Sequence, residues 1–336
     1  MRAPAFWEAS PSHPAARLLS PLGSFYGLFT AARMDRPGAT GPCPVICVGN
    51  LTLGGAGKTP TALAIAAMLR GLGAAPAFLT RGYGGRLPGP VLVDAGRHDA
   101  AEIGDEALLL TREAMTVVAR DRPAGARLCV VSGASVVVMD DGLQNPSLMK
   151  DLALAVVDAG AGIGNGLPFP AGPLRVPLDR QWRHVDAMVL VGEGSAGEAV
   201  ADLAAARGLP IFRARLVPHH SARELAGRCL LPFAGIGRPS KFFATLREAG
   251  AELSGERSFP DHHPYRDSDL TSLVAEARKL GADLITTQKD AVRLPKSFVG
   301  RVETLAVSLR FADEVAVMAL LRTKLLAFGR RVPRSS

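Results

Sequence analysis

The stretch VICVGNLTLGGAGKTPTALAIAAMLRGLG, residues 45–73, decides the fold class of this 336-residue chain. An apolar run is followed by a glycine-rich loop, and a helical pattern begins near Thr59. A strand, a loop and a helix in this order turn backbone N–H groups and the positive end of the helix dipole toward an anion such as phosphate. Thr52 stands where the common form of such a loop opens with glycine. The stretch therefore predicts a phosphate-binding loop with an unusual entry.

The residues of this loop suit a nucleotide and its metal ion. Lys58 is expected to reach the β- and γ-phosphates of ATP, and the hydroxyl of Thr59 is expected to bind Mg²⁺. Pro60 is acceptable because the first helical turn has no N–H partner to lose. The alternative is a glycine-rich turn that binds nothing. The predicted nucleotide-binding residues are Thr52, Gly54, Gly55, Ala56, Gly57, Lys58 and Thr59.

Short apolar runs alternate with helical patterns on both sides of a Gly/Pro-rich passage at residues 160–173. This alternation predicts a parallel sheet flanked by helices. We expect an α/β fold of the P-loop NTPase type, a second, smaller α/β domain and an N-terminal amphipathic helix. The expected boundaries are 1–40 for the N-terminal segment, 41–175 for the nucleotide-binding domain and 176–336 for the second domain.

Composition restricts the partners. The formal net charge of +8 favours anionic partners. Nucleic acid is not expected, because aromatic residues make up only 5% of the chain and no Lys/Arg run interleaves with them. Four cysteines without paired spacing predict neither a disulfide framework nor a zinc site, which fits a reducing compartment. No uninterrupted apolar span reaches the roughly 18 to 20 residues that a membrane helix needs.

Residues 16–36, ARLLSPLGSFYGLFTAARMDR, predict an amphipathic helix with basic residues at its ends. Two interpretations of its apolar face remain open: it packs on the protein's own core, or it lies in a membrane interface. The predicted apolar face consists of Leu18, Leu22, Phe25, Tyr26 and Phe29.

Two pairs of carboxylates are candidates for chemistry. Asp140 and Asp141 follow a buried strand pattern, where an α/β sheet collects its ligands, and suit Mg²⁺ coordination. The alternative is that Asp-Gly only makes a turn. Asp105 and Glu106 begin a helical pattern, where acidic residues also serve as ordinary caps.

Histidines and cations on loops complete the candidate set. His262 and His263, in FPDHHPY, suit proton handling, although a surface histidine pair often has no function. Cations beside glycine and proline suit phosphate binding, with ordinary surface charge as the alternative. These cations are Arg81, Arg122, Arg175 and Lys289.

The chain resembles the tetraacyldisaccharide 4'-kinases of lipid A assembly over roughly residues 6–297. The motifs that carry the resemblance occur in the family's order: FW, GNLTLGGAGKTP, LTRGYGG, GDEALLL, DDGLQN, FPAGPLR, FPDHHPY and TQKDAVRLP. Threonine ahead of the loop glycines also resembles the family pattern.

The resemblance implies transfer of the γ-phosphate of ATP to the 4'-hydroxyl of an acylated glucosamine disaccharide 1-phosphate. It implies a monomer bound peripherally (monotopically) to the cytoplasmic face of the inner membrane, with two α/β domains that close around ATP. Asp105 with His262 resembles the family's proton-abstracting pair, and Lys58 with Arg122 or Arg175 would stabilise the transferring phosphoryl group. The implied ligands of Mg²⁺ are Thr59, Glu106, Asp140 and Asp141.

The sequence departs from the family's commoner pattern at Ala107, Asn145, Val176 and Gln288. None of these departures removes a proposed catalytic group, but they leave open any substrate or nucleotide contact at positions 145 and 176. Two other functions also remain open. One is a different P-loop phosphotransferase or ligase acting on a soluble metabolite, and the other is a nucleotide-gated membrane-binding switch.

Overall fold

The computed structural model describes residues 4–219, 222–298 and 300–331. The described chain forms two compact units, a larger one from residues 4–216 and 309–331 and a smaller one from residues 217–308. This division differs from the expected boundary after residue 175. Strands after that residue continue the sheet of the larger unit, and the C-terminal helix packs on this sheet.

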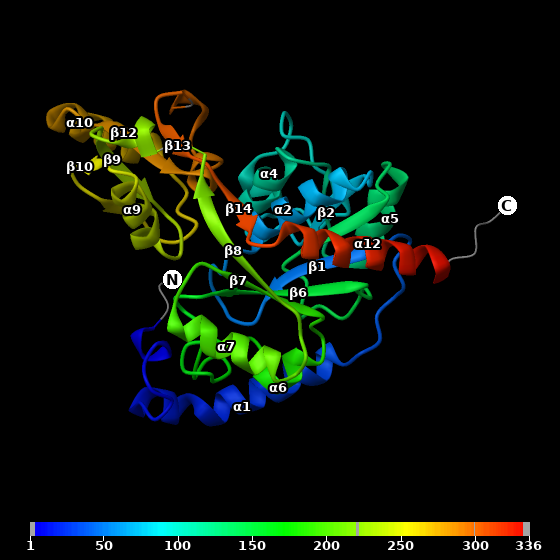
Figure 1. Ribbon diagram of the computed structural model, residues 1–336. Helices are drawn as coiled ribbons and strands as arrows, with labels where there is room; N and C mark the ends of the chain where they lie inside the picture. The colour runs from blue at the N-terminus through cyan, green and yellow to red at the C-terminus, as the bar shows by residue number, and fades with distance from the viewer. Residues whose placement is uncertain (1–3, 220–221, 299, 332–336) are drawn as a thin grey trace. The chain divides into compact units, whose positions relative to one another are not determined.

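The larger unit contains a nine-stranded sheet in the order β14-β8-β7-β6-β1-β5-β2-β4-β3 (Figure 1). Neighbouring strands from β4 to β8 are parallel, whereas β3 runs antiparallel to β4. The strands are β1 (Val45–Asn50), β2 (Pro76–Thr80), β3 (Val91–Leu92), β4 (Thr116–Val118), β5 (Val136–Asp140), β6 (Leu152–Asp158), β7 (Ala187–Val191), β8 (Ile211–Pro218) and β14 (Val307–Phe311).

Helices cover both faces of this sheet, as the alternating pattern predicts. Ile65 of α2 and Leu321 of α12 pack on one face, and Cys129 of α5 and Val200 of α7 pack on the other. The helices of the larger unit are η1 (Ala5–Trp7), α1 (Pro14–Met34), α2 (Lys58–Gly71), α3 (Ala100–Ile103), α4 (Asp105–Thr111), α5 (Arg122–Val131), α6 (Leu178–Trp182), α7 (Ser195–Ala205) and α12 (Glu314–Arg331). None of the helices in the described ranges is both long and apolar enough to cross a membrane.

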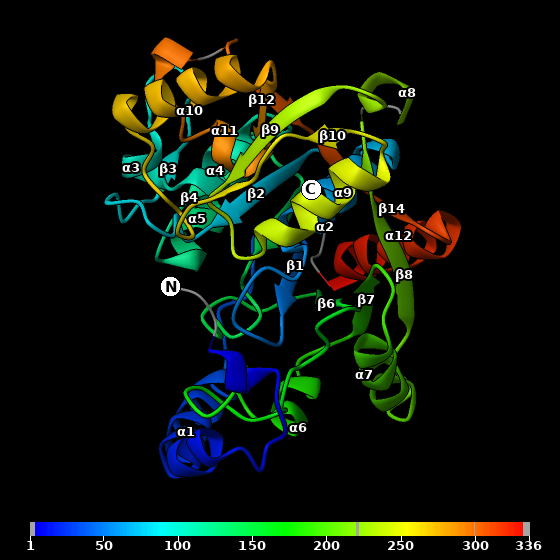
Figure 2. The same cartoon turned by 90° about the vertical axis from the view of Figure 1, so that its left-hand side faces the viewer.

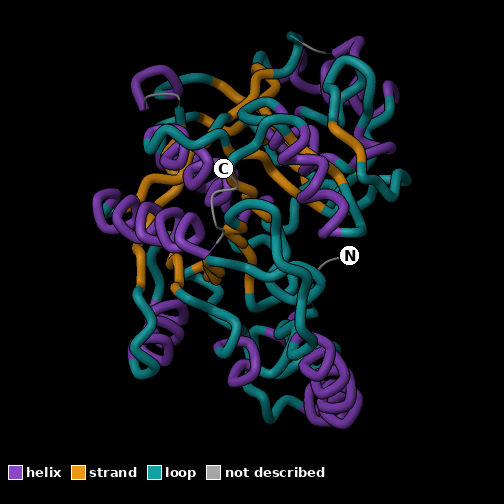
Figure 3. Tube along the Cα trace, turned by 90° about the vertical axis from the view of Figure 1, so that its right-hand side faces the viewer, coloured by secondary structure: helices purple, strands orange, loops and turns teal. Residues whose placement is uncertain are grey.

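Helix α1 lies beside loops of the larger unit (Figure 3). Small residues of the helix make this contact. A Cβ atom on Gly23 would lie 2.8 Å from the Pro168 carbonyl oxygen, and one on Gly27 would lie 2.9 Å from Cδ of Pro177. Most of the large apolar side chains point away from this contact and are exposed, whereas the Tyr26 ring also packs edge-on against Phe169 at 5.5 Å. Their exposed fractions are 81% for Leu18, 60% for Leu22, 76% for Phe25, 41% for Tyr26 and 66% for Phe29. The interpretation that this face packs on the protein's own core is therefore wrong.

The smaller unit repeats the layered plan around a five-stranded sheet. Its order is β10-β9-β12-β13, with β11 paired to β9. Phe243 of α9 packs on one face and Leu273 of α10 on the other (Figure 2). The elements are α8 (Ala222–Leu225), β9 (Cys229–Ala234), α9 (Pro239–Glu248), β10 (Glu252–Leu253), β11 (Arg257–Ser258), α10 (Asp267–Leu280), β12 (Asp283–Thr287), α11 (Gln288–Ala291), η2 (Lys296–Phe298) and β13 (Glu303–Leu305).

Candidate active site

The predicted phosphate loop connects β1 to α2 at the carboxyl edge of the nine-stranded sheet. Gly54 and Gly57 have φ values of 114° and 90°, a conformation that favours glycine. Thr52 has no positive φ, and its backbone pairs with Leu174 in an isolated bridge. Threonine is tolerated at the loop entry because the backbone is extended there, and an extended backbone does not need the conformational freedom of glycine.

Lys58 lies across its own loop. Its Nζ atom is 3.5 Å from the Gly54 carbonyl oxygen and 3.9 Å from Oδ2 of Asp141. Both contacts are long, so they hold the amine weakly. The amine is therefore available for exchange to a stronger acceptor such as a phosphate oxygen.

Arg175 connects the loop entry to the end of β5. Its two terminal nitrogens each donate to a carboxylate oxygen of Asp141 at 2.9 Å, and its Nε donates to the Thr52 carbonyl oxygen at 3.1 Å. A bidentate guanidinium–carboxylate pair is among the stronger hydrogen-bonded contacts. The Gly/Pro-rich passage before Arg175 thus brings this residue to the phosphate loop, as its candidate role requires.

Two glutamines that the sequence analysis did not single out support this arrangement. Gln144 donates to the Asn50 carbonyl oxygen at 2.8 Å, and its own carbonyl accepts from Arg175 at 3.2 Å. Gln181 donates to the carbonyl oxygens of Leu51 and Val176 at 3.0 and 2.7 Å. Gln144 belongs to the DDGLQN motif, so the motif contained a signal, whereas nothing around Gln181 distinguishes it in the sequence.

Asp140 and Asp141 have different surroundings. Burial alone would raise the pKa of Asp141, but the charges of Lys58 and Arg175 outweigh it and hold the pKa below its ordinary value. Both Asp141 oxygens are taken by Arg175, whereas Asp140 ends β5 with 1% exposure. Metal binding by Asp141 would therefore use the lone pairs that Arg175 leaves open, since each carboxylate oxygen can accept more than one contact.

Arg122 begins α5 and is 2% exposed. It donates to the Ala119 carbonyl oxygen at 2.7 Å, and its Nε has no hydrogen-bond partner among the described residues. Burial lowers the pKa of Arg122 to about 10, against the opposing charges of Asp140 and Asp141. The guanidinium stays charged at neutral pH. Direct contact with a phosphate would require its covering side chains to move.

Asp105 begins α4 and accepts a hydrogen bond from the backbone N–H of Glu106 at 2.9 Å. The N-cap of α4 is Gly104, and no side chain caps this helix, so Asp105 is not an ordinary N-terminal cap. The contact with the Glu106 N–H fixes the direction of the carboxylate. A Cβ on Gly104 would lie 2.3 Å from the Tyr83 carbonyl oxygen, so the RGYGG loop packs directly on the start of α4. This contact explains why the RGYGG and GDE motifs occur together.

His262 belongs to the smaller unit and has a φ of 58°, while Asp105 belongs to the larger unit. Their pairing therefore stays a prediction. His263 accepts or donates a hydrogen bond with Asp269 at 3.0 Å, which gives it a local structural role.

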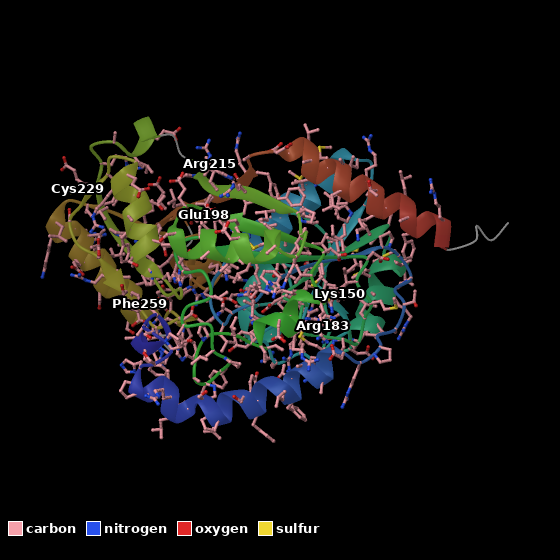
Figure 4. All side chains as sticks on the ribbon, turned by 60° about the horizontal axis from the view of Figure 1, so that its bottom comes forward. Lys150, Arg183, Glu198, Arg215, Cys229 and Phe259 are labelled. Carbon is pink, nitrogen blue, oxygen red and sulfur yellow. The ribbon has the colours of Figure 1, made fainter. Side chains whose placement is uncertain are left out.

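The four departures from the family pattern all have local structural roles. Asn145 accepts hydrogen bonds from the backbone and hydroxyl of Ser147, and Gln288 accepts one from the backbone of Val307 at 3.1 Å. Ala107 and Val176 are fully buried and pack in apolar clusters. Lys150, labelled in Figure 4, donates to the Asn145 carbonyl oxygen at 2.6 Å and holds the same loop.

The fold and the loop define a nucleotide-binding α/β protein with a phosphate loop. A family model described as tetraacyldisaccharide-1-P 4'-kinase matches residues 15–326. The chain is 65% identical to the tetraacyldisaccharide 4'-kinase of Methylorubrum populi over 97% of this chain and 99% of that protein. It is 53% identical to that of Rhodopseudomonas palustris over 96% of each. The chain therefore belongs to the tetraacyldisaccharide 4'-kinase family, which confirms the resemblance.

A solved structure of the same family has a similar fold. LpxK from Aquifex aeolicus, in complex with ATP, is 25% identical with a TM-score of 0.73, covering 92% of this chain and 99% of that chain. The fold class predicted from the sequence is confirmed.

We expect Arg175→Ala to weaken ATP binding roughly 10- to 100-fold. The change removes a charged donor from the Thr52 carbonyl oxygen and leaves Asp141 free to compete for Lys58, and charge-assisted hydrogen bonds contribute about 1.5–3 kcal/mol each. Isothermal titration calorimetry measures the affinity. Arg213→Ala, which breaks an exposed pair with Glu198, is the matched control and should bind ATP normally. Unchanged affinity in Arg175→Ala would show that the pair does not support the loop.

Proposed function

We propose that this protein transfers the γ-phosphate of ATP to the 4'-hydroxyl of a tetraacyldisaccharide 1-phosphate. One observation carries the proposal: Lys58 and Arg175 both contact Asp141 at the mouth of the phosphate loop, and the three residues come from three separate family motifs. Family membership supplies the identity of the acceptor. The arrangement supplies the cationic site that phosphoryl transfer needs.

The chain's own residues perform the nucleotide part of this reaction. Backbone N–H groups from Gly54 to Thr59 and the start of α2 face the phosphates. Lys58 exchanges its long contacts with Gly54 and Asp141 for the β- and γ-phosphate oxygens. Because phosphoryl transfer demands little covalent help, this positive charge lowers the barrier more than a base does.

The residues present fit Mg²⁺. The hydroxyl of Thr59 and the carboxylate of Asp140 are oxygen ligands of the kind that Mg²⁺ prefers, and Glu106 and Asp141 are further candidates. No three His, Cys, Asp or Glu side chains cluster as a metal site in the described residues. Mg²⁺ usually takes one or two protein carboxylates and fills the rest of its shell with phosphate oxygens and water. When bound, the ion would neutralise charge on the β- and γ-phosphates.

Proton removal from the acceptor is assigned to Asp105 and His262. A carboxylate can orient an imidazole, and either group can accept the hydroxyl proton as the oxygen attacks phosphorus. The left-handed backbone at His262 supports the assignment, since such unfavourable backbone conformations gather at functional sites.

The exposed face of α1 supports a membrane-surface location. Large apolar side chains point outward while Arg17 and Arg33 lie near the two ends of the helix. The acyl chains of the acceptor cannot leave a bilayer cheaply, because each buried CH₂ contributes about 0.8 kcal/mol. We therefore infer that α1 lies in the interface at the cytoplasmic face of the inner membrane.

Lys58→Ala should lower phosphate transfer roughly 100- to 1000-fold, because it removes a cation from the transferring group. The measurement follows γ-labelled ATP with disaccharide 1-phosphate in detergent. Lys324→Ala on α12, which removes a partly exposed ion pair with Asp186, is the matched control and should transfer normally. In the same assay, the unmodified protein distinguishes the other functions. Hydrolysis of ATP without transfer to lipid would favour a nucleotide-gated switch, and transfer to a soluble acceptor would favour a different kinase or ligase.

Asp105→Asn and His262→Asn should each lower kcat and leave ATP affinity nearly unchanged, and the double variant should be little worse than either. When two residues act as one proton-transfer unit, the effects of substituting them on kcat are not additive in free energy. Asparagine is chosen at position 262 because it tolerates the left-handed backbone. Steady-state kinetics of the three variants measures these losses. If the fold-loss of kcat in the double variant equals the product of the two single losses, Asp105 and His262 act independently.

Replacing Leu22, Phe25 and Phe29 together with serine should weaken liposome binding and raise the KM for lipid, while ATP binding stays unchanged. These side chains are exposed, so their loss should leave the fold intact. Vesicle co-sedimentation measures the binding. A control triple variant with serine at Val131, Leu203 and Val315, which are exposed elsewhere on the larger unit, should bind vesicles normally. Equal vesicle binding by both triple variants would rule out α1 as the contact.

A further inference from the structure

The loop that carries His262 is held by its backbone. His262 has a left-handed backbone, and its N–H donates to the Gly235 carbonyl oxygen at 3.0 Å. A non-glycine residue keeps this conformation only where its surroundings impose it. What holds Gly235 therefore also decides where the His262 backbone lies.

Gly235 is held at both of its polar backbone atoms. Its N–H donates to Oδ1 of Asp290 at 2.9 Å, and its carbonyl oxygen accepts from Arg293 at 2.9 Å. The same Arg293 nitrogen donates to Asp290 at 2.6 Å. A Cβ on Gly235 would lie 3.0 Å from the Pro260 carbonyl oxygen, so the histidine loop lies directly against it.

Asp290 also holds the other side of the same loop. Tyr265, three residues after His262, donates its hydroxyl to Asp290 at 2.8 Å. Burial and the adjacent Asp290 carboxylate raise the pKa of Tyr265, so the hydroxyl remains a donor. Phe259, labelled in Figure 4, packs edge-on against Tyr265 at the start of the loop. Asp290 itself has no exposed surface.

We propose that Asp290, with Arg293 and Tyr265, is a positioning group for His262 in the transfer reaction. The buried carboxylate fixes Gly235 and Tyr265, these two residues fix the two flanks of the loop, and the loop directs the imidazole. This inference rests on the proposed role of His262 in proton transfer. Asp290 touches neither substrate nor nucleotide in this role. It also gives the TQKDAVRLP motif a physical reason, since the motif supplies both members of the Asp290–Arg293 pair.

The alternative is that the network of Asp290, Arg293 and Tyr265 only stabilises the smaller unit. A double-mutant cycle measured by kcat distinguishes this alternative from the positioning role. Asp290→Asn should lower kcat roughly 10- to 100-fold with the KM for ATP unchanged, because a misplaced reacting group loses rate without losing nucleotide binding. In the His262→Asn background the same substitution should change kcat by less than about twofold, because its effect acts through the missing imidazole. Tyr265→Phe, which removes one hydrogen bond, should give a smaller loss in the same direction and serves if Asp290→Asn does not fold.

Glu303→Gln is the matched control. Glu303 begins β13 and accepts two hydrogen bonds from Arg228, which precedes β9, so this pair lies at the opposite edge of the sheet from Gly235 and Asp290. It should lower the unfolding midpoint and leave kcat unchanged in both backgrounds. Equal losses from Asp290→Asn in the two backgrounds, or a kcat loss in Glu303→Gln of the same size, would overturn the positioning role alone. Wild-type kcat in His262→Asn would overturn the proposed base and the positioning role together.

Discussion

Burial of both faces of the nine-stranded sheet determines where polar chemistry can occur in the larger unit. Strands β1 and β5 have no exposed side chains along their length, so a charged group within them would have no water and few partners. Polar residues are therefore found where the strands end, as Asn50 and Asp140 show. The phosphate loop begins at this edge because a strand end and a helix start supply free N–H groups together.

At this edge, cations and carboxylates control one another. Arg175 holds Asp141 in a bidentate pair, which leaves Lys58 with only a 3.9 Å contact to the same carboxylate. A tighter pair between Lys58 and Asp141 would compete with the phosphates for the amine. Arg175 thus serves the loop twice, by occupying the carboxylate and by anchoring the Thr52 carbonyl oxygen.

Much of the larger unit could be predicted from local pattern. The loop at residues 45–73 is local, so its strand and helix were predicted correctly. The division into units was not, because residues 217–308 lie between β8 and β14, and both units have the same βα alternation. The Arg175–Asp141 pair could not be predicted from the sequence either. A cation on a loop looks the same in sequence whether it meets solvent or a carboxylate, and only the bridge between Thr52 and Leu174 brings it back to β1.

Helix α1 shows a second limit of periodicity. A pattern of large apolar residues defines one face of a helix but not the direction in which that face points. In α1 the small residues Gly23 and Gly27 allow close approach to Pro168 and Pro177, and this contact turns the large side chains outward. Each Leu or Phe left exposed forgoes about 1.5–3 kcal/mol of burial. An apolar face of this size is costly in water and would be favourable in a lipid interface, which is the reason for the proposed membrane-surface location of α1.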